Sequence, residues 1–155
     1  MPQTLSVLGA GSWGTALAIQ AARNGCQTML WGHNSEQANL LQQTRENARY
    51  LPGIIFPSNL TISGDLQECV NFSPLLLLSV PSQAFKTTLK SIKPFLGPKP
   101  RIAWATKGFD SHNGALLSKV VEEILGKNVL TAVLSGPTFA REVADGLPTA
   151  ITVAS

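Results

Sequence analysis

Close to the start of the chain, residues 9–14 read GAGSWG and match the pattern G-x-G-x-x-G. The match directly follows a short apolar run, Leu5–Leu8, and precedes a segment whose apolar residues recur at helical spacing. A strand, a glycine turn and a helix in this order open a βαβ unit of the type that binds dinucleotides. This placement, more than the glycines alone, predicts a dinucleotide site.

Each glycine of this turn has its own expected task. Gly9 permits a tight turn, Gly11 lets the backbone come close to a pyrophosphate, and Gly14 lets the helix pack near the strand. Unpaired N–H groups and the positive end of the helix dipole then face the phosphates. Trp13, beside the turn, is expected either in the core or against the cofactor.

Beyond the turn, short apolar runs alternate with segments of helical period. With 155 residues, 44% of them apolar, the chain can build one domain with a core, predicted as a dinucleotide-binding domain over residues 1–155. The alternation predicts an α/β fold, a Rossmann-type doubly wound and mostly parallel sheet flanked by helices. The expected strands are Leu5–Leu8, Gln27–Trp31, Leu60–Ile62, Leu75–Val80, Arg101–Ala105, Val129–Leu134 and Thr149–Val153, and later helices are expected after Ser35 as N-cap and over Asp65–Val70, Ala84–Ile92, Ala115–Leu125 and Thr138–Ala144.

The second strand ends in residues 31–34, WGHN, where an Asp or Glu commonly accepts hydrogen bonds from the ribose hydroxyls, about 20 residues past the turn. No carboxylate stands there. An acid would repel a 2′-phosphate, whereas His33 and Asn34 can donate hydrogen bonds to one. The expected cofactor is therefore NADP or NAD. The alternative is that His33 is an ordinary loop residue without a role in binding. Glu36 could replace the missing acid, although its position at a helix start explains it more simply.

Two further candidate binding segments are expected at the end of the sheet where the carboxyl ends of the parallel strands lie. Lys107 follows the strand Arg101–Ala105, and a cation there can hold a phosphate or polarise a carbonyl. Residues 135–140, SGPTFA, repeat the order strand, turn, helix start, with Pro137 near the first helical position and Thr138 able to offer a hydroxyl to an anion. An ordinary surface lysine and an ordinary capped helix are the simpler alternatives. Residues 45–58 lose all period and predict an irregular loop, whose length suggests a functional insertion.

Composition argues against other functional classes. The 12 Lys and Arg exceed the 9 Asp and Glu by only three, and they are scattered, so a small anionic ligand fits better than nucleic acid. The longest apolar run, Leu75–Leu78, is far shorter than the ~18 residues of a membrane span, and no export signal opens the chain, so we expect no membrane insertion and a cytoplasmic location. Cys26 and Cys69 have no metal-ligand spacing with either histidine, and we expect no metal site.

Several motifs together resemble the bacterial NAD(P)-dependent glycerol-3-phosphate dehydrogenases. They are GAGSWG at 9–14, LWGH at 30–33, NARYLP at 47–52, VPS at 80–82, WATKG at 104–108 and SGPTFA at 135–140, and this ordered set covers nearly the whole chain. The resemblance implies reduction of dihydroxyacetone phosphate to sn-glycerol 3-phosphate, the backbone of glycerophospholipids, by hydride transfer from NAD(P)H.

The resemblance also implies roles for individual residues. It makes Lys107, Gly136 and Thr138 substrate contacts, and it places His33 where many members have Arg. In the family an all-helical carboxyl-terminal domain supplies the catalytic lysine, whereas this chain stops at Ser155. We therefore expect no catalytic residue in residues 1–155, weak cofactor binding and little or no turnover, and a homodimer is one assembly the protein could form. The implied cofactor contacts are Ser12, Trp13, His33, Asn34, Tyr50, Lys107 and Ala140.

Two alternatives stay open at this point. One is another dehydrogenase on the same scaffold, acting on a hydroxy acid or a nucleotide sugar. Against it, Lys107 and the turn at 136–138 both suit an anion and favour a phosphorylated three-carbon substrate. The other is a non-catalytic dinucleotide sensor or binding module, which predicts nucleotide binding that glycerol 3-phosphate does not change.

Overall fold

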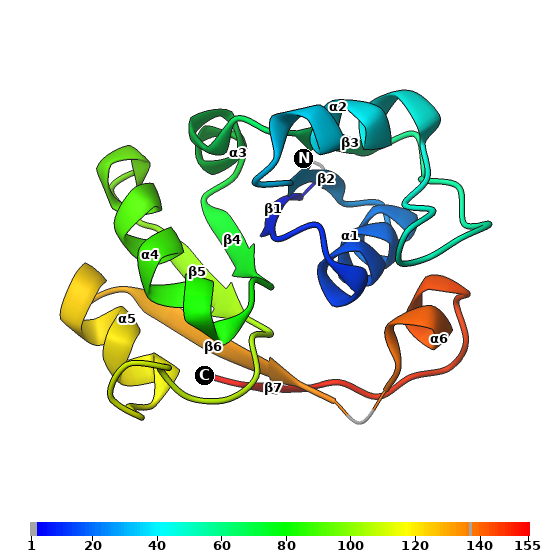
Figure 1. Cartoon of the computed structure of the whole chain (residues 1–155). Helices are drawn as coiled ribbons and strands as arrows, with labels where there is room; N and C mark the ends of the chain where they lie inside the picture. The colour runs from blue at the N-terminus through cyan, green and yellow to red at the C-terminus, as the bar shows by residue number, and fades with distance from the viewer. Residues whose placement is uncertain (1–2, 137) are drawn as a thin grey trace.

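The computed structural model describes residues 3–136 and 138–155. In this part of the chain seven strands form one sheet in the order β3-β2-β1-β4-β5-β6-β7 (Figure 1). All neighbouring strands are parallel except β6 and β7. The predicted Rossmann-type, mostly parallel sheet is therefore confirmed. The strands are β1 (Thr4–Leu8), β2 (Gln27–Trp31), β3 (Leu60–Ser63), β4 (Leu75–Leu78), β5 (Arg101–Trp104), β6 (Leu130–Ser135) and β7 (Thr152–Ala154).

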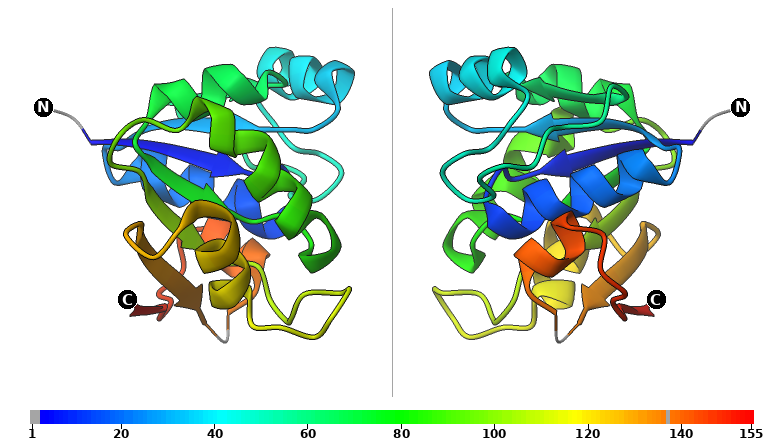
Figure 2. Two further views of the ribbon diagram at one scale, coloured as in Figure 1. Left: turned by 90° about the vertical axis from the view of Figure 1, so that its left-hand side faces the viewer. Right: turned by 90° about the vertical axis from the view of Figure 1, so that its right-hand side faces the viewer.

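Helices cover both faces of this sheet (Figure 2). Each face has its own core cluster of buried apolar side chains. None of the helices among the described residues is long and apolar enough to cross a membrane. One face carries α1 (Ser12–Arg23), α2 (Ser35–Thr44) and α6 (Ala140–Ala144), and the other carries α3 (Leu66–Phe72), α4 (Ser82–Ile92) and α5 (Leu117–Leu125), with a 3-10 turn η1 (Lys93–Phe95) after α4.

The central strands show why this sequence forms a sheet buried on both sides. Successive side chains of a strand point to opposite faces, so Val7 of β1 joins the core beneath α1 while Leu8 joins the core beneath α4. In β4, Leu77 pairs with Val7 and shares its face, and Leu76 and Leu78 face the other way. A strand covered on both faces requires an unbroken apolar run, which the four leucines supply.

One predicted helix cap is wrong. Ser35 is the first residue of α2, and the cap is Asn34, whose Oδ1 accepts a hydrogen bond from the backbone N–H of Gln37 at 3.0 Å. Both residue types cap helices well, and apolar period alone does not distinguish adjacent positions. A glycine with positive φ follows each of the helices α1 and α5, Gly25 at +88° and Gly126 at +93°.

The last third of the chain departs most from the predicted boundaries. The helix α5 begins at Leu117, because Leu116 forms an antiparallel bridge with Phe109 in the preceding loop. The last helix begins at Ala140 rather than at Thr138. The final strand spans Thr152–Ala154 and runs antiparallel to β6. The prediction for Pro137 falls on a residue outside the described ranges.

The irregular loop predicted over residues 45–58 is confirmed, and it is part of the core. Leu51, Ile54 and Phe56 are buried against α1 and its neighbours. Arg45 takes a left-handed conformation with φ of 58°, and its Nη2 donates to the carbonyl oxygens of Pro57 and Leu60, each at 2.7 Å. These contacts fasten both ends of the loop.

Candidate functional site: a nucleotide pocket at the sheet edge

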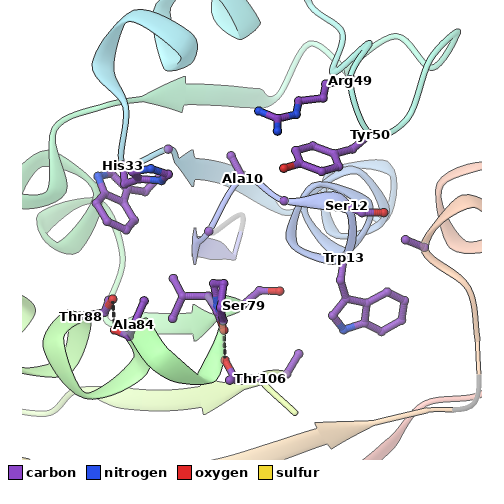
Figure 3. A pocket seen from close by; sticks show the side chains of 18 of the residues that line it. Ala10, Ser12, Trp13, His33, Arg49, Tyr50, Ser79, Ala84, Thr88 and Thr106 are labelled. Atoms are coloured by element: carbon purple, nitrogen blue, oxygen red, sulfur yellow. Dashed lines mark hydrogen bonds between the residues drawn. The ribbon is translucent and has the colours of Figure 1, made fainter. Parts of the chain in front are cut away.

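An open pocket of about 700 Å³ lies beyond the carboxyl ends of β1, β2, β4 and β5 (Figure 3). The strand order reverses here, because the chain runs from β1 outward to β3 and then returns to β4 on the other side of β1. Open α/β sheets bind ligands at such a switch point, and the volume suits a small organic molecule. Its lining comes from residues 9–13, 31–33, 79–81, 105–107 and 138–140, from the helices α2 and α4, and from Arg49 and Tyr50 of the loop.

The glycine turn contains two positions, Gly9 and Gly14, at which another backbone segment lies too close for a side chain. Gly9 has φ of +124°, and a Cβ on it would lie 2.7 Å from the carbonyl oxygen of Ser79. A Cβ on Gly14 would lie 1.9 Å from the carbonyl oxygen of Gly9. Gly11 differs from both, since a Cβ there would meet no atom within 4 Å. The turn therefore excludes side chains at its ends and presents a bare, open backbone at its middle, as the approach of a pyrophosphate requires.

The amino terminus of α1 opens onto this bare backbone. Its N-cap, Gly11, has no side chain to accept from the first N–H groups, and the first turn contains no Asp or Glu. Ser12 and Trp13, the first two helical residues, line the pocket. Free N–H groups and the positive end of the helix dipole favour an anion at this position.

Charged side chains of one sign line the pocket. Arg49 and Lys107 are exposed cations at its wall, and His33 lies at the end of β2. The described lining residues include no Asp or Glu. Neither of these cations, nor His33, takes part in an ion pair with any described residue. The pocket therefore offers its positive charge to an anionic ligand.

Most residues predicted for the site line this one pocket, and three do not. Gly14 is buried beneath the turn, Asn34 caps α2, and Gly136 lies close to the chain at Ala150, so their contact roles stay predictions. Trp13 packs against the core and also lines the pocket, and its contact with the cofactor stays a prediction. The lining includes Gly9, Gly11, Ser12, Trp13, His33, Tyr50, Lys107, Thr138 and Ala140 of the predicted set.

The pocket lining also includes four residues that were not predicted from the sequence as site residues: Arg49, Gln37, Ser79 and Thr106. Ser79 and Thr106 follow β4 and β5, so the rule that ligands lie at the carboxyl ends of strands could have found both. The Thr106 hydroxyl donates to the carbonyl oxygen of Val80 at 2.8 Å and joins these two strand ends (Figure 3). Arg49 lies within the NARYLP motif at 47–52, but the loop has no periodicity from which the direction of its side chain could be predicted.

The loop after Lys107 is organised by a buried carboxylate, Asp110. Burial by itself raises the pKa of this carboxyl. Hydrogen bonds from the backbone N–H and ring of His112, both at 3.3 Å, and the ammonium of Lys86 at 3.8 Å outweigh it and hold the pKa below its usual value. Asp110 also pairs through its backbone with Ala115 and Gly114. The loop is therefore held in place beside Lys107.

Asn47 fastens the irregular loop to the glycine turn. Its side chain is fully buried, and its Nδ2 donates to the carbonyl oxygen of Ala10 at 3.2 Å and to Oγ1 of Thr15 at 3.0 Å. The wall that carries Arg49 and Tyr50 is thereby joined to the turn.

Replacing Asn47 by leucine removes both hydrogen bonds and keeps most of the volume. Each buried group left without a partner costs about 1–3 kcal/mol, so we expect the free energy of unfolding to fall by about 2–4 kcal/mol. Urea denaturation followed by tryptophan fluorescence measures the change. Asn128→Leu, in the loop before β6, is the matched surface control and should lie within about 0.5 kcal/mol of the parent protein. Equal stability of the two variants would contradict the role given to Asn47.

The strand order, the glycine turn and the free helix terminus together define a Rossmann-type domain with a nucleotide pocket. A family model, the amino terminus of NAD-dependent glycerol-3-phosphate dehydrogenase, matches residues 4–155. The chain belongs to this family.

Individual relatives agree with the family match. The curated glycerol-3-phosphate dehydrogenase [NAD(P)+] of Aeromonas hydrophila is 54% identical over 151 residues, which are 97% of this chain and 45% of the relative. A crystal structure of glycerol-3-phosphate dehydrogenase from Coxiella burnetii superposes with a TM-score of 0.93 at 42% identity, covering 98% of this chain and 46% of that one. The enzyme from Saccharomyces cerevisiae gives 0.85 at 27% identity, covering 99% and 47%. The chain thus spans about half the length of the relatives it matches.

Proposed function

We propose that the pocket binds NAD(H) or NADP(H) and that the protein is an oxidoreductase interconverting dihydroxyacetone phosphate and sn-glycerol 3-phosphate. The observation that carries this proposal is the open backbone at Gly11, above the uncapped amino terminus of α1 and inside a pocket whose described lining has no carboxylate. A pyrophosphate needs this combination of close approach and positive potential. The family match and the names of the relatives support the same activity.

The substrate phosphate and carbonyl have candidate partners on the opposite wall. Among residues 3–136 and 138–155, the Lys107 ammonium has no ion-pair partner, and Oγ1 of Thr138 is buried without a hydrogen-bond partner. A buried hydroxyl without a partner is uncommon in native proteins and fits a role in ligand binding. We propose that Lys107 and Thr138 hold the anionic, three-carbon substrate beside the cofactor.

The proposed reaction consumes one hydride and one proton. When bound, NAD(P)H would supply a hydride for the carbonyl carbon of dihydroxyacetone phosphate, and a proton would complete the new hydroxyl group, so that NAD(P)H and H⁺ would yield NAD(P)⁺ and sn-glycerol 3-phosphate. The residues described here bind and orient the reactants. We propose that the proton comes from a carboxyl-terminal helical domain, as in the family, and that residues 1–155 alone bind nucleotide weakly with little turnover. We also propose that the protein is cytoplasmic, that its product sn-glycerol 3-phosphate is used for the synthesis of glycerophospholipids, and that it forms a homodimer.

Kinetics of the full-length protein test the assignment of Lys107. A hydrogen bond to a charged group contributes about 1.5–3 kcal/mol, so Lys107→Ala should lower kcat/KM for dihydroxyacetone phosphate by about 10- to 100-fold. Lys99→Ala, in the loop before β5 at the opposite edge of the sheet, is the control and should match the parent protein. Faster reduction of 2-keto acids than of dihydroxyacetone phosphate would contradict the proposed substrate and favour a hydroxy-acid dehydrogenase. Nucleotide binding without turnover of any of these compounds would favour a binding module.

A further inference from the structure

We infer that Asp110 is a positioning residue, which fixes the backbone beside Lys107 so that the Lys107 ammonium is held at the pocket wall. This inference rests on the proposed function, because it presupposes that Lys107 holds the substrate. Asp110 itself is not among the lining residues of the pocket, so it acts through Lys107 rather than on a ligand. The burial of Asp110, the closure of its loop and an ion pair with α4 support this role.

The side chain of Asp110 is a buried carboxylate in an exposed loop. It is only 2% exposed, whereas residues 107–109 and 111–114 on either side are exposed. A buried carboxylate costs free energy, and an apolar side chain of similar size often fills such a place at lower cost. Although burial raises it, hydrogen bonds from His112 and the ammonium of Lys86 hold the pKa of Asp110 below its usual value, so the group is charged at neutral pH. Packing alone does not require this charge.

The loop is closed at its base around Asp110. The backbone N–H of Asp110 donates to the carbonyl oxygen of Ala115 at 2.8 Å, and the N–H of Gly114 donates to the Asp110 carbonyl oxygen at 2.9 Å. Inside the loop, the backbone nitrogen and ring Nδ1 of His112 each lie 3.3 Å from Oδ1 of Asp110. The carboxylate thus binds the inner side of a closed loop that begins directly after residues 107–109.

An ion pair joins this closed loop to a helix of the pocket wall. Nζ of Lys86 lies 3.8 Å from Oδ2 of Asp110, and Oδ2 accepts no hydrogen bond from any described residue. Lys86 belongs to α4, and Ala84 and Thr88 of the same helix line the pocket (Figure 3). The contact between loop and helix through Asp110 is therefore electrostatic, and it depends on the charge of both groups.

The two residues that hold the chain around Lys107 lie on either side of it. Before it, the Thr106 hydroxyl donates to the carbonyl oxygen of Val80 at 2.8 Å. After it, the chain passes through Gly108, which has φ of +94° and is the residue type with the greatest backbone freedom, before it reaches Asp110. A lysine side chain has many rotamers, so the place of its ammonium depends on a fixed backbone. Without Asp110 this backbone would be held at one end only.

A double-mutant cycle in the full-length protein tests whether Asp110 acts through Lys107. We expect Asp110→Ala to raise KM for dihydroxyacetone phosphate and to lower kcat/KM by about tenfold, because a displaced ammonium loses much of its contact with the substrate. In a Lys107→Ala background the same change should alter kcat/KM by less than about twofold, since the group that Asp110 positions is gone. The Kd for NADPH and NADH should stay within about twofold of the parent value in each variant.

Variants of the ion pair test the contribution of charge. Asp110→Asn keeps the size and an oxygen for His112 but loses the charge, and Lys86→Met removes the ammonium, so each should lower kcat/KM by about two- to fivefold. Lys86→Arg keeps the charge and should restore the parent value. Glu122→Ala, which removes the ion pairs of α5 with Lys119 and Lys127, is the matched control and should change neither KM nor Kd.

The outcomes separate this inference from the proposed function. Equal losses from Asp110→Ala in the parent and Lys107→Ala backgrounds, or a parallel loss of NADPH affinity, would mean that Asp110 supports the domain in general and would overturn the inference. Parent-like kinetics of Lys86→Met would overturn the role of the ion pair. Parent-like kinetics of Lys107→Ala would instead contradict the proposed function. Thermal denaturation verifies the fold of each variant, and the cycle uses Asp110→Asn where Asp110→Ala does not fold.

Discussion

A Gly14→Ala variant is expected to lose much of the stability of the domain. The added methyl carbon would lie 1.9 Å from the carbonyl oxygen of Gly9 and 3.2 Å from the Cβ of Ser79. The first of these contacts is with backbone, which cannot rotate away as a side chain can. Either α1 moves off the sheet or the turn opens, and both disrupt packing around β1 and β4. We expect the free energy of unfolding to fall by about 3–5 kcal/mol.

Thermal and urea denaturation measure this loss. For a domain of this size, 1 kcal/mol corresponds to about 2–4 °C in Tm, so the variant should melt roughly 10 °C below the parent protein. Gly97→Ala is the matched control, because a Cβ on Gly97 would meet no atom within 4 Å and the residue is exposed. A Gly14→Ala variant as stable as Gly97→Ala would mean that the helix and the turn are not in the contact described.

A Gly11→Ala variant should show the opposite behaviour, with a stable fold and impaired nucleotide binding. Gly11 has φ of −77° and ψ of −171°, which any residue adopts, and a Cβ there would have free space for at least 4 Å. The change in folding free energy should stay within about 1 kcal/mol. The methyl group, however, occupies the place where the backbone must approach the pyrophosphate. We expect affinity for NADP⁺ and NAD⁺ to fall about 100-fold, or roughly 2.7 kcal/mol.

Calorimetry with both nucleotides and a parallel melting curve test this pair of statements together. Gly97→Ala again serves as control, now for binding, and should match the parent protein. An unchanged affinity in Gly11→Ala would mean that the pyrophosphate does not bind at the glycine turn. A large loss of stability would mean that the space around Gly11 is filled, and the reason given for the glycine would be wrong.

The parts of the molecule that depend on local pattern could be predicted. The strands β1, β2 and β4 and the glycine turn follow from contiguous apolar runs and from spacing within six residues. Their positions in the sheet then follow from the handedness of crossovers, which places the pocket without further information. This is why Lys107 and His33 were identified and the structure brings them into one lining.

Features that depend on contacts between distant segments could not be predicted. Arg49 lies in a loop without period, and it reaches the pocket because Asn47 bonds to Ala10, 37 residues away in the chain. The direction of β7 depends in the same way on how α6 docks on α1, since an apolar run indicates a strand but not its orientation. One-residue shifts such as that between Asn34 and Ser35 lie below what propensity resolves.

The hydrogen bonds of Asn47 have a consequence for protein engineering. Because they join the loop to the first turn of α1, the two segments form one mechanical unit, and neither can be exchanged without the other. Transferring this loop to a homologue would require moving residues 45–58 as a block, together with a hydroxyl at the position of Thr15. Introducing an arginine at the position of Arg49 alone would leave its backbone without the hydrogen bonds of Asn47 that hold this loop against the glycine turn.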